Sequence, residues 1–204
     1  MDKKEKEKSY IEDYISDVKE SLDFFSNKRK PEREKWVVNE LLTYFKMEFK
    51  PAELCSYKDE PPDIIFRDAH FEIKEIQNNN RRRTDEYKNT LEKARKAGRI
   101  SELLEQYTPI NISIDGAFLI IAPATDKWTA KYGLSLCEKL DLLIYLNLRG
   151  TTLDCDDLEI IDDKDKIQGW RSISVVSNNC AFVISAAASA PIFLQIRSGK
   201  IFKK

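Results

Sequence analysis

The chain has 204 residues, enough for one domain with an appendage but short for two independent cores. It contains 34 Lys and Arg against 35 Asp and Glu, so the formal net charge is -1 and a histone-like or generally cationic protein is excluded. Any surface for nucleic acid must therefore be a local patch. Only 6 glycines and 7 prolines are present, which argues against a disordered or collagen-like chain.

The cysteine pattern and the lack of long apolar runs restrict the class further. No two of the four cysteines form a CxxC pair, which excludes zinc-finger and thioredoxin-type motifs. The chain opens with charged residues instead of a secretory signal, and its longest apolar stretches, such as 116–123, are too short to span a bilayer. We therefore expect a cytoplasmic protein with reduced thiols and no membrane contact.

Two amphipathic helices are predicted at the start of the chain. Apolar residues recur at steps of four and three from Ile11 to Phe25, which is typical of a helix with a narrow apolar stripe. Pro31 is well placed as the first residue of a second helix, whose broad apolar face runs from Trp36 to Phe45. The stripe of the first helix is also a candidate seam for a homodimer.

A hairpin and a third helix are predicted next. The β-rich runs 63–66 and 70–76 flank a tight turn and predict two antiparallel strands. The polar run 77–83 ends the second strand, and a helix is expected from Thr84 toward Leu104, with a weak point at Gly98.

The second half predicts a mixed α/β class. Residues 117–132 favour a helix over a strand followed by a helix, and the continuous apolar run 140–148 predicts a strand that is covered on both faces. Residues 154–165 read as an acidic loop, and 181–185 and 192–196 as strands. This order of helices and strands favours an α/β fold.

The hairpin carries the candidate chemistry. Because side chains alternate along a strand, Glu72 and Lys74 share one face while Phe71 and Ile73 share the other, which can face the core. The neighbouring strand places Asp63 across the ladder from Glu72. Two carboxylates so placed repel each other unless a cation lies between them, and Mg²⁺ (or Mn²⁺) fits because it takes one or two carboxylates, waters and phosphate oxygens. A lysine beside the ion can orient or deprotonate a bound water and offset charge on a phosphate.

Structural alternatives exist for each of these residues. Asp63 follows a proline, where a turn-forming aspartate is common, and Glu72 and Lys74 can form a cross-strand ion pair on a solvated face. Acid-x-lysine tripeptides recur elsewhere in this highly charged chain. The copy at Glu72 differs because it lies in an apolar strand and follows Pro62-Asp63.

Pro62-Asp63 followed by Glu72-Ile73-Lys74 resembles the PD-(D/E)xK signature of the restriction-endonuclease-like nuclease superfamily. The resemblance implies a core of a helix, a three-stranded meander, a helix and a strand. We accordingly expect an N-terminal helical extension over 1–30 and a restriction-endonuclease-like domain over 31–204. Residues 26–105 also resemble a small bacterial family of uncharacterised proteins classed as candidate endonucleases; the likeness includes 31–37 and Pro61 to Ala69.

Members of that superfamily often add a glutamate from the first core helix to the metal site. Glu34 is the preferred candidate because it lies three and four residues before Val37 and Val38, on or beside the apolar face. Glu32 and Glu40 are further candidates. The alternative is a first-turn glutamate that the helix dipole stabilises.

The run Arg81-Arg82-Arg83 is the best candidate for contact with nucleic acid. It follows the strand that bears Glu72 and Lys74, and guanidinium groups pair well with phosphates. The next helix carries further lysines and arginines, but acidic residues interleave with them, so a solvated helix face is the alternative.

These expectations combine into a metal-dependent endonuclease. It would hydrolyse phosphodiester bonds of nucleic acid, with DNA the expected substrate. Asp63, Glu72 and Glu34 would bind the metal, Lys74 would position the attacking water, and the arginine run would hold the backbone. The alternative is a catalytically inactive module of the same fold that binds nucleic acid or a protein partner.

Overall fold

The computed structural model describes residues 3–57, 61–78, 81–104, 108–155 and 169–203. The contacts between residues group the chain into two compact units. The first comprises Met1–Arg33 and Asn79–Thr108, and the second comprises Glu34–Asn78 and Pro109–Lys204. The segment 79–108, predicted to lie in the main domain, thus groups with the N-terminal residues.

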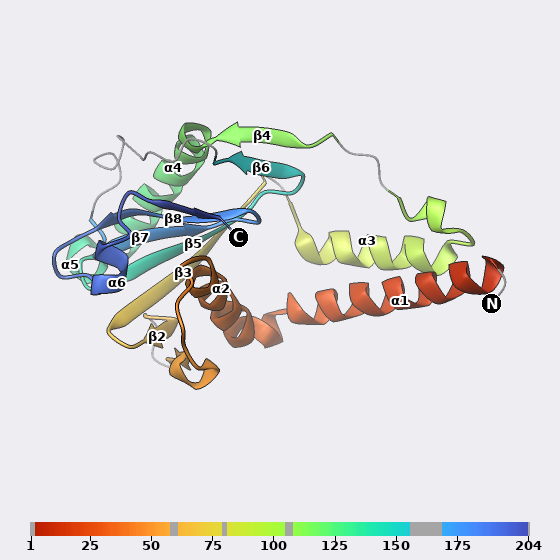
Figure 1. Cartoon of the computed structure of the whole chain (residues 1–204), viewed down its shortest axis with the longest axis horizontal. Helices are drawn as coiled ribbons and strands as arrows, with labels where there is room; N and C mark the ends of the chain where they lie inside the picture. Colours follow the sequence, from red (N-terminus) through yellow and green to blue (C-terminus); the bar gives the residue numbers. More distant parts are fainter. Residues whose placement is uncertain (1–2, 58–60, 79–80, 105–107, 156–168, 204) are drawn as a thin grey trace. The chain divides into compact units, whose positions relative to one another are not determined.

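The first unit contains two long helices, α1 (Lys3–Phe24) and α3 (Arg83–Lys96), which run side by side in opposite directions (Figure 1). The first predicted helix is confirmed; the second is confirmed at its start, but it ends at Lys96 and does not continue to Leu104. Ile11 and Val18 of the α1 stripe are buried, and the homodimer stays a prediction. α3 ends near the weak point expected at Gly98, whose N–H donates to the Glu102 carboxylate at 2.9 Å.

The second unit contains a mixed seven-stranded sheet in the order β1-β2-β3-β5-β7-β8-β9. The strands are β1 (Cys55–Ser56), β2 (Ile64–Phe66), β3 (Ala69–Gln77), β5 (Asp141–Asn147), β7 (Ser172–Val176), β8 (Cys180–Ala186) and β9 (Ile201–Lys203). β3, β5 and β7 are parallel to one another, and the other neighbours are antiparallel. A separate parallel pair consists of β4 (Ile110–Ser113) and β6 (Thr151–Asp154).

Helices cover both faces of the large sheet. α2 (Lys30–Tyr44) and α6 (Ile192–Gln195) share one buried cluster with Leu143, whereas α4 (Ile114–Tyr132) and the short α5 (Leu134–Cys137) share the other with Leu142 (Figure 1). Neighbouring residues of β5 thus point into different cores. This confirms the prediction of a strand covered on both faces.

Predictions for the hairpin and for the long helix hold better than those for short apolar runs. The hairpin of β2 and β3 and the helix over 117–132 are confirmed. The strand predicted over 192–196 is wrong: Ile192–Gln195 is a helix that begins directly after Pro191. A short apolar run fits either state, so its surroundings decide. Of the acidic loop, Asp154 closes β6 and 156–168 lie outside the described residues.

The connections of the sheet also differ from the expected core. The strand beside β3 is β5, which follows only after β4 and α4, and three more strands extend the sheet beyond it. Among the helices in the described part of the chain, none has the length and apolar content needed to cross a membrane.

Tyr44 provides a test of the core on the α2 side. Its hydroxyl is buried and donates to the carbonyl oxygens of Ser177 and Asn178 at 3.3 and 3.0 Å. Burial, followed by the nearby charges of Cys180 and Glu40, raises the pKa of Tyr44 to about 12.

We expect the substitution Tyr44→Phe to lower the free energy of unfolding by about 1 kcal/mol at neutral pH. An unfolded tyrosine loses its proton near pH 10, so the stabilisation is present below that pH and is lost as the pH rises toward 12. Urea unfolding of both proteins between pH 8 and 11 measures this. A stability difference that stays constant up to pH 11 would contradict the assignment.

Candidate active site

The β2–β3 hairpin brings Asp63 to Glu72. Ile64 pairs with Phe71, so the same register places Asp63 opposite Glu72. Asp63 is only 3% exposed, and its Oδ2 accepts a hydrogen bond from the Ile73 N–H at 2.8 Å. A second bond, from the Asp63 N–H to the Phe71 carbonyl at 2.9 Å, continues the ladder. The Asp63 carboxylate is thereby held against β3, the strand that bears Glu72.

Glu72 is a buried carboxylate with an uneven set of partners. It is 2% exposed. Its Oε1 accepts a hydrogen bond from the Tyr132 hydroxyl at 2.7 Å and pairs with the Lys74 ammonium. Its Oε2 is also buried but has no hydrogen-bond partner among the described residues. A buried charged oxygen without a donor is costly, so this atom marks a place where a cation would be stabilising.

Lys74 is held as an ammonium. Burial by itself would lower the pKa of Lys74, but its hydrogen bonds to Glu72 and Tyr132 outweigh burial and raise that pKa. Its Nζ also lies 5.3 Å from the centre of the Tyr132 ring, within reach of a cation–π interaction. At neutral pH this group supplies a positive charge and cannot accept a proton.

The face of β3 that bears Glu72 and Lys74 is covered instead of open to solvent. Phe71 is buried and Ile73 partly buried in the α2-side core, as predicted. The opposite face, with Glu72 and Lys74, lies under α4, which contributes Tyr132 as its last residue. Sequence reasoning missed Tyr132, because a tyrosine at the end of an apolar helix carries no pattern that links it to a strand 60 residues earlier.

Glu34 stays a prediction as a metal ligand. It lies near the start of α2 and is half-buried. Within the residues that the structure describes, no group of three or more His, Cys, Asp or Glu side chains could hold a metal ion. The site is therefore a pair of carboxylates with a lysine and a tyrosine.

The three arginines belong to the unit of α1 and α3. Arg81 Nε donates to the Glu86 carboxylate at 3.1 and 2.9 Å. Arg83 is 8% exposed, and its guanidinium lies 4.1 Å from the centre of the Phe25 ring. Arg82 is exposed. Arg81 and Arg83 thus contribute to packing within this unit, while Arg82 presents its charge to solvent; their contact with nucleic acid stays a prediction.

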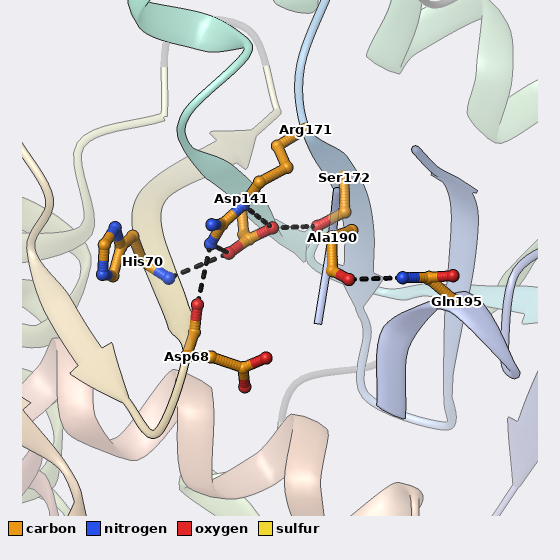
Figure 2. Close-up of polar contacts among 7 residues, drawn as sticks. All are labelled: Asp68, His70, Asp141, Arg171, Ser172, Ala190 and Gln195. Atoms are coloured by element: carbon orange, nitrogen blue, oxygen red, sulfur yellow. Dashed lines mark hydrogen bonds and ion pairs between the residues drawn. The ribbon is translucent and has the colours of Figure 1, made fainter. Parts of the chain in front are cut away.

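A second polar cluster joins the starts of three strands (Figure 2). Asp141 is fully buried; its Oδ1 accepts hydrogen bonds from Arg171 Nε at 3.1 Å and Ser172 Oγ at 2.7 Å, and its Oδ2 accepts one from the His70 N–H at 2.8 Å. Arg171 also pairs with Oδ2 and donates to the Asp68 carbonyl at 3.1 Å. The His70 ring points away from Asp141 (Figure 2), so these residues do not form a catalytic triad. The cluster fastens β3, β5 and β7 together.

Comparisons with known proteins give one family and one fold. The model of a family described as "Putative endonuclease, protein of unknown function (DUF1780)" matches residues 6–204. None of the curated proteins matches the chain. A solved structure of a protein of unknown function from Pseudomonas aeruginosa strain PAO1, described as monooxygenase superfamily, is similar with a TM-score of 0.67 and 23% identity, over 100% of this chain and 97% of that one. At this identity the likeness concerns the fold alone.

This structural likeness corrects one prediction. The restriction-endonuclease-like core is wrong, because the similar solved structure is assigned to another superfamily and the sheet is a mixed one of seven strands; the α/β class is confirmed. The physical reason is that the motif from Pro62 to Lys74 specifies one hairpin. A hairpin does not determine which later strands pair with its outer edge, since those contacts join residues far apart in the chain.

Proposed function

We propose that this chain, which belongs to the DUF1780 family of "putative endonuclease" proteins, is a metal-dependent phosphodiesterase. It would cleave nucleic acid, with DNA as the preferred substrate. The observation that carries the proposal is the buried Glu72 Oε2 without a hydrogen-bond partner among the described residues, on a residue that faces Asp63 across the hairpin.

The residues present fit Mg²⁺ or Mn²⁺. Asp63 and Glu72 would supply carboxylate oxygens, and the hard ion would complete its shell with waters and a phosphate oxygen, as Mg²⁺ does in sites with one or two carboxylates. Such an ion supplies Lewis-acid polarisation of the phosphate and a more acidic water. Two carboxylates suffice for this type of site, and Glu34 would act through water.

The other side chains would act on substrate and water. The Lys74 ammonium would offset negative charge that develops on the phosphate and orient the attacking water, and its raised pKa argues against a role as general base. The exposed Arg82 would contact the phosphate backbone.

Titration of the protein with Mn²⁺ by calorimetry tests the site. We expect one ion to bind to the wild type and the substitution Asp63→Asn to lower the affinity by at least about 100-fold, because one of two charged ligands is lost. Asp68→Asn is the matched control, since Asp68 lies exposed in the turn of the same hairpin, and it should bind as the wild type does. Equal affinity of Asp63→Asn and the wild type would contradict the site.

A binding module without catalysis is the second candidate. The pairing of Glu72 with Lys74 favours it, because the two charges already balance each other inside the protein. This function would show as binding of DNA that is equal for wild type and Asp63→Asn, in a protein that binds no Mn²⁺ and cleaves nothing.

A further inference from the structure

We propose that Tyr132 is a positioning residue of this site, whose hydroxyl holds the Glu72 carboxylate so that Oε2 is left for the cation. The inference rests on the proposed function and adds to it a residue from α4. It starts from the uneven use of the two Glu72 oxygens, since both donors address Oε1 and neither addresses Oε2.

Tyr132 is the more rigid of the two donors. Its ring packs edge-on against Trp170 with the ring centres 5.9 Å apart. The Trp170 indole N–H donates at 2.9 Å to the hydroxyl of Thr129, which lies on α4 together with Tyr132. Helix α4 ends directly after Tyr132, where Gly133 adopts a φ of 78° that suits glycine. The tyrosine hydroxyl is thus fixed by packing, whereas the Lys74 ammonium ends a flexible four-carbon chain.

A single flexible donor would not fix the carboxylate. With Lys74 alone, the Glu72 group could rotate about its last bond and present either oxygen, or both, to the ammonium. The phenol removes this freedom because it holds Oε1 from a fixed position.

The phenol also holds the lysine. The Lys74 Nζ lies 5.3 Å from the centre of the same ring, so one side chain contacts both partners of the ion pair. As a neutral donor, Tyr132 orients the carboxylate without cancelling the charge that would attract a divalent ion. A second positively charged donor in the place of Tyr132 would cancel that charge.

The test is Mn²⁺ titration of Tyr132→Phe, which removes the hydroxyl and keeps the ring. We expect about a tenfold loss of affinity, the size typical of a lost partner of a metal ligand. Tyr44→Phe is the matched control, because it removes a buried hydroxyl from the opposite core and should leave Mn²⁺ affinity unchanged. The melting temperatures of both variants should fall by similar amounts.

The outcomes separate the two proposals. Loss of affinity in Tyr132→Phe with a melting temperature close to that of Tyr44→Phe supports the positioning role. If Tyr132→Phe binds Mn²⁺ as tightly as the wild type while Asp63→Asn does not, the positioning role is overturned and the proposed function stands. If the melting temperature of Tyr132→Phe falls well below that of the control, the role is structural and the inference is overturned. A wild type that binds no Mn²⁺ overturns both proposals.

Discussion

Replacing Lys74 by methionine is expected to lower metal-dependent cleavage of DNA by about 100-fold or more, while Mn²⁺ affinity is kept or increased. The ammonium now pairs with Glu72. In the proposed reaction, its removal would free that carboxylate for the ion but would take away the positive charge that offsets the developing charge on the phosphate. Cleavage of plasmid DNA under single-turnover conditions and Mn²⁺ titration of the same sample measure the two effects. This divergence distinguishes Lys74 from Asp63, whose loss should reduce both.

Stability provides a second readout of the same substitution. Without Lys74, Glu72 is a buried charge with one neutral donor, so the metal-free variant should unfold at lower urea concentration than the wild type. Mn²⁺ should restore more stability to the variant than it adds to the wild type, because a ligand stabilises the state that binds it. Lys127→Met, on the exposed side of α4, is the control. Cleavage by Lys74→Met at the wild-type rate would refute the role of this lysine.

Replacing Asp141 by asparagine is expected to lower the free energy of unfolding by about 3 kcal/mol or more, the range for a buried ion pair that loses one partner. Asp141 is 0% exposed and the Arg171 side chain is 13% exposed, so solvent cannot compensate the guanidinium. The amide of asparagine would also turn a donor toward groups that already donate, namely Ser172 Oγ, Arg171 and the His70 N–H. Urea unfolding followed by circular dichroism measures the loss.

The control is Asp126→Asn, an exposed position on α4, which should change stability by less than about 0.5 kcal/mol. We expect the folded Asp141→Asn variant to bind Mn²⁺ with the affinity of the wild type. The hydrogen bonds of Asp141 join it to Arg171, Ser172 and the His70 N–H, and not to the proposed metal ligands. A variant as stable as the wild type would show that the cluster does not hold the strand starts together.

The hairpin was predictable because its interactions are local. Asp63 and Glu72 are nine residues apart, and the alternation of Phe71 and Ile73 with Glu72 and Lys74 follows from the pleat alone. The sequence also predicted that β5 is covered on both faces, since a continuous apolar run has no polar face to expose. These inferences needed no knowledge of which elements meet.

The arginine run shows how a partner distant in sequence changes an interpretation. Three successive arginines after a strand favour phosphate contact. In the structure, Arg83 packs over Phe25, which follows α1 far earlier in the sequence, and Phe25 stacks in turn on Tyr87 with the ring centres 5.7 Å apart. Nothing in the run itself distinguishes Arg83 from the exposed Arg82.

The amino-acid sequence by itself determined the chemistry of one hairpin: which two carboxylates oppose each other, and which lysine shares their face. Only the tertiary structure decided that α4 covers this face, that Tyr132 completes the site and that Asp141 and Arg171 fasten the strand starts. The physical reason is that the strand pleat assigns side chains to faces within a few residues. The element that covers a face is selected by packing between segments 30 to 71 residues apart, for which the local pattern carries no signal.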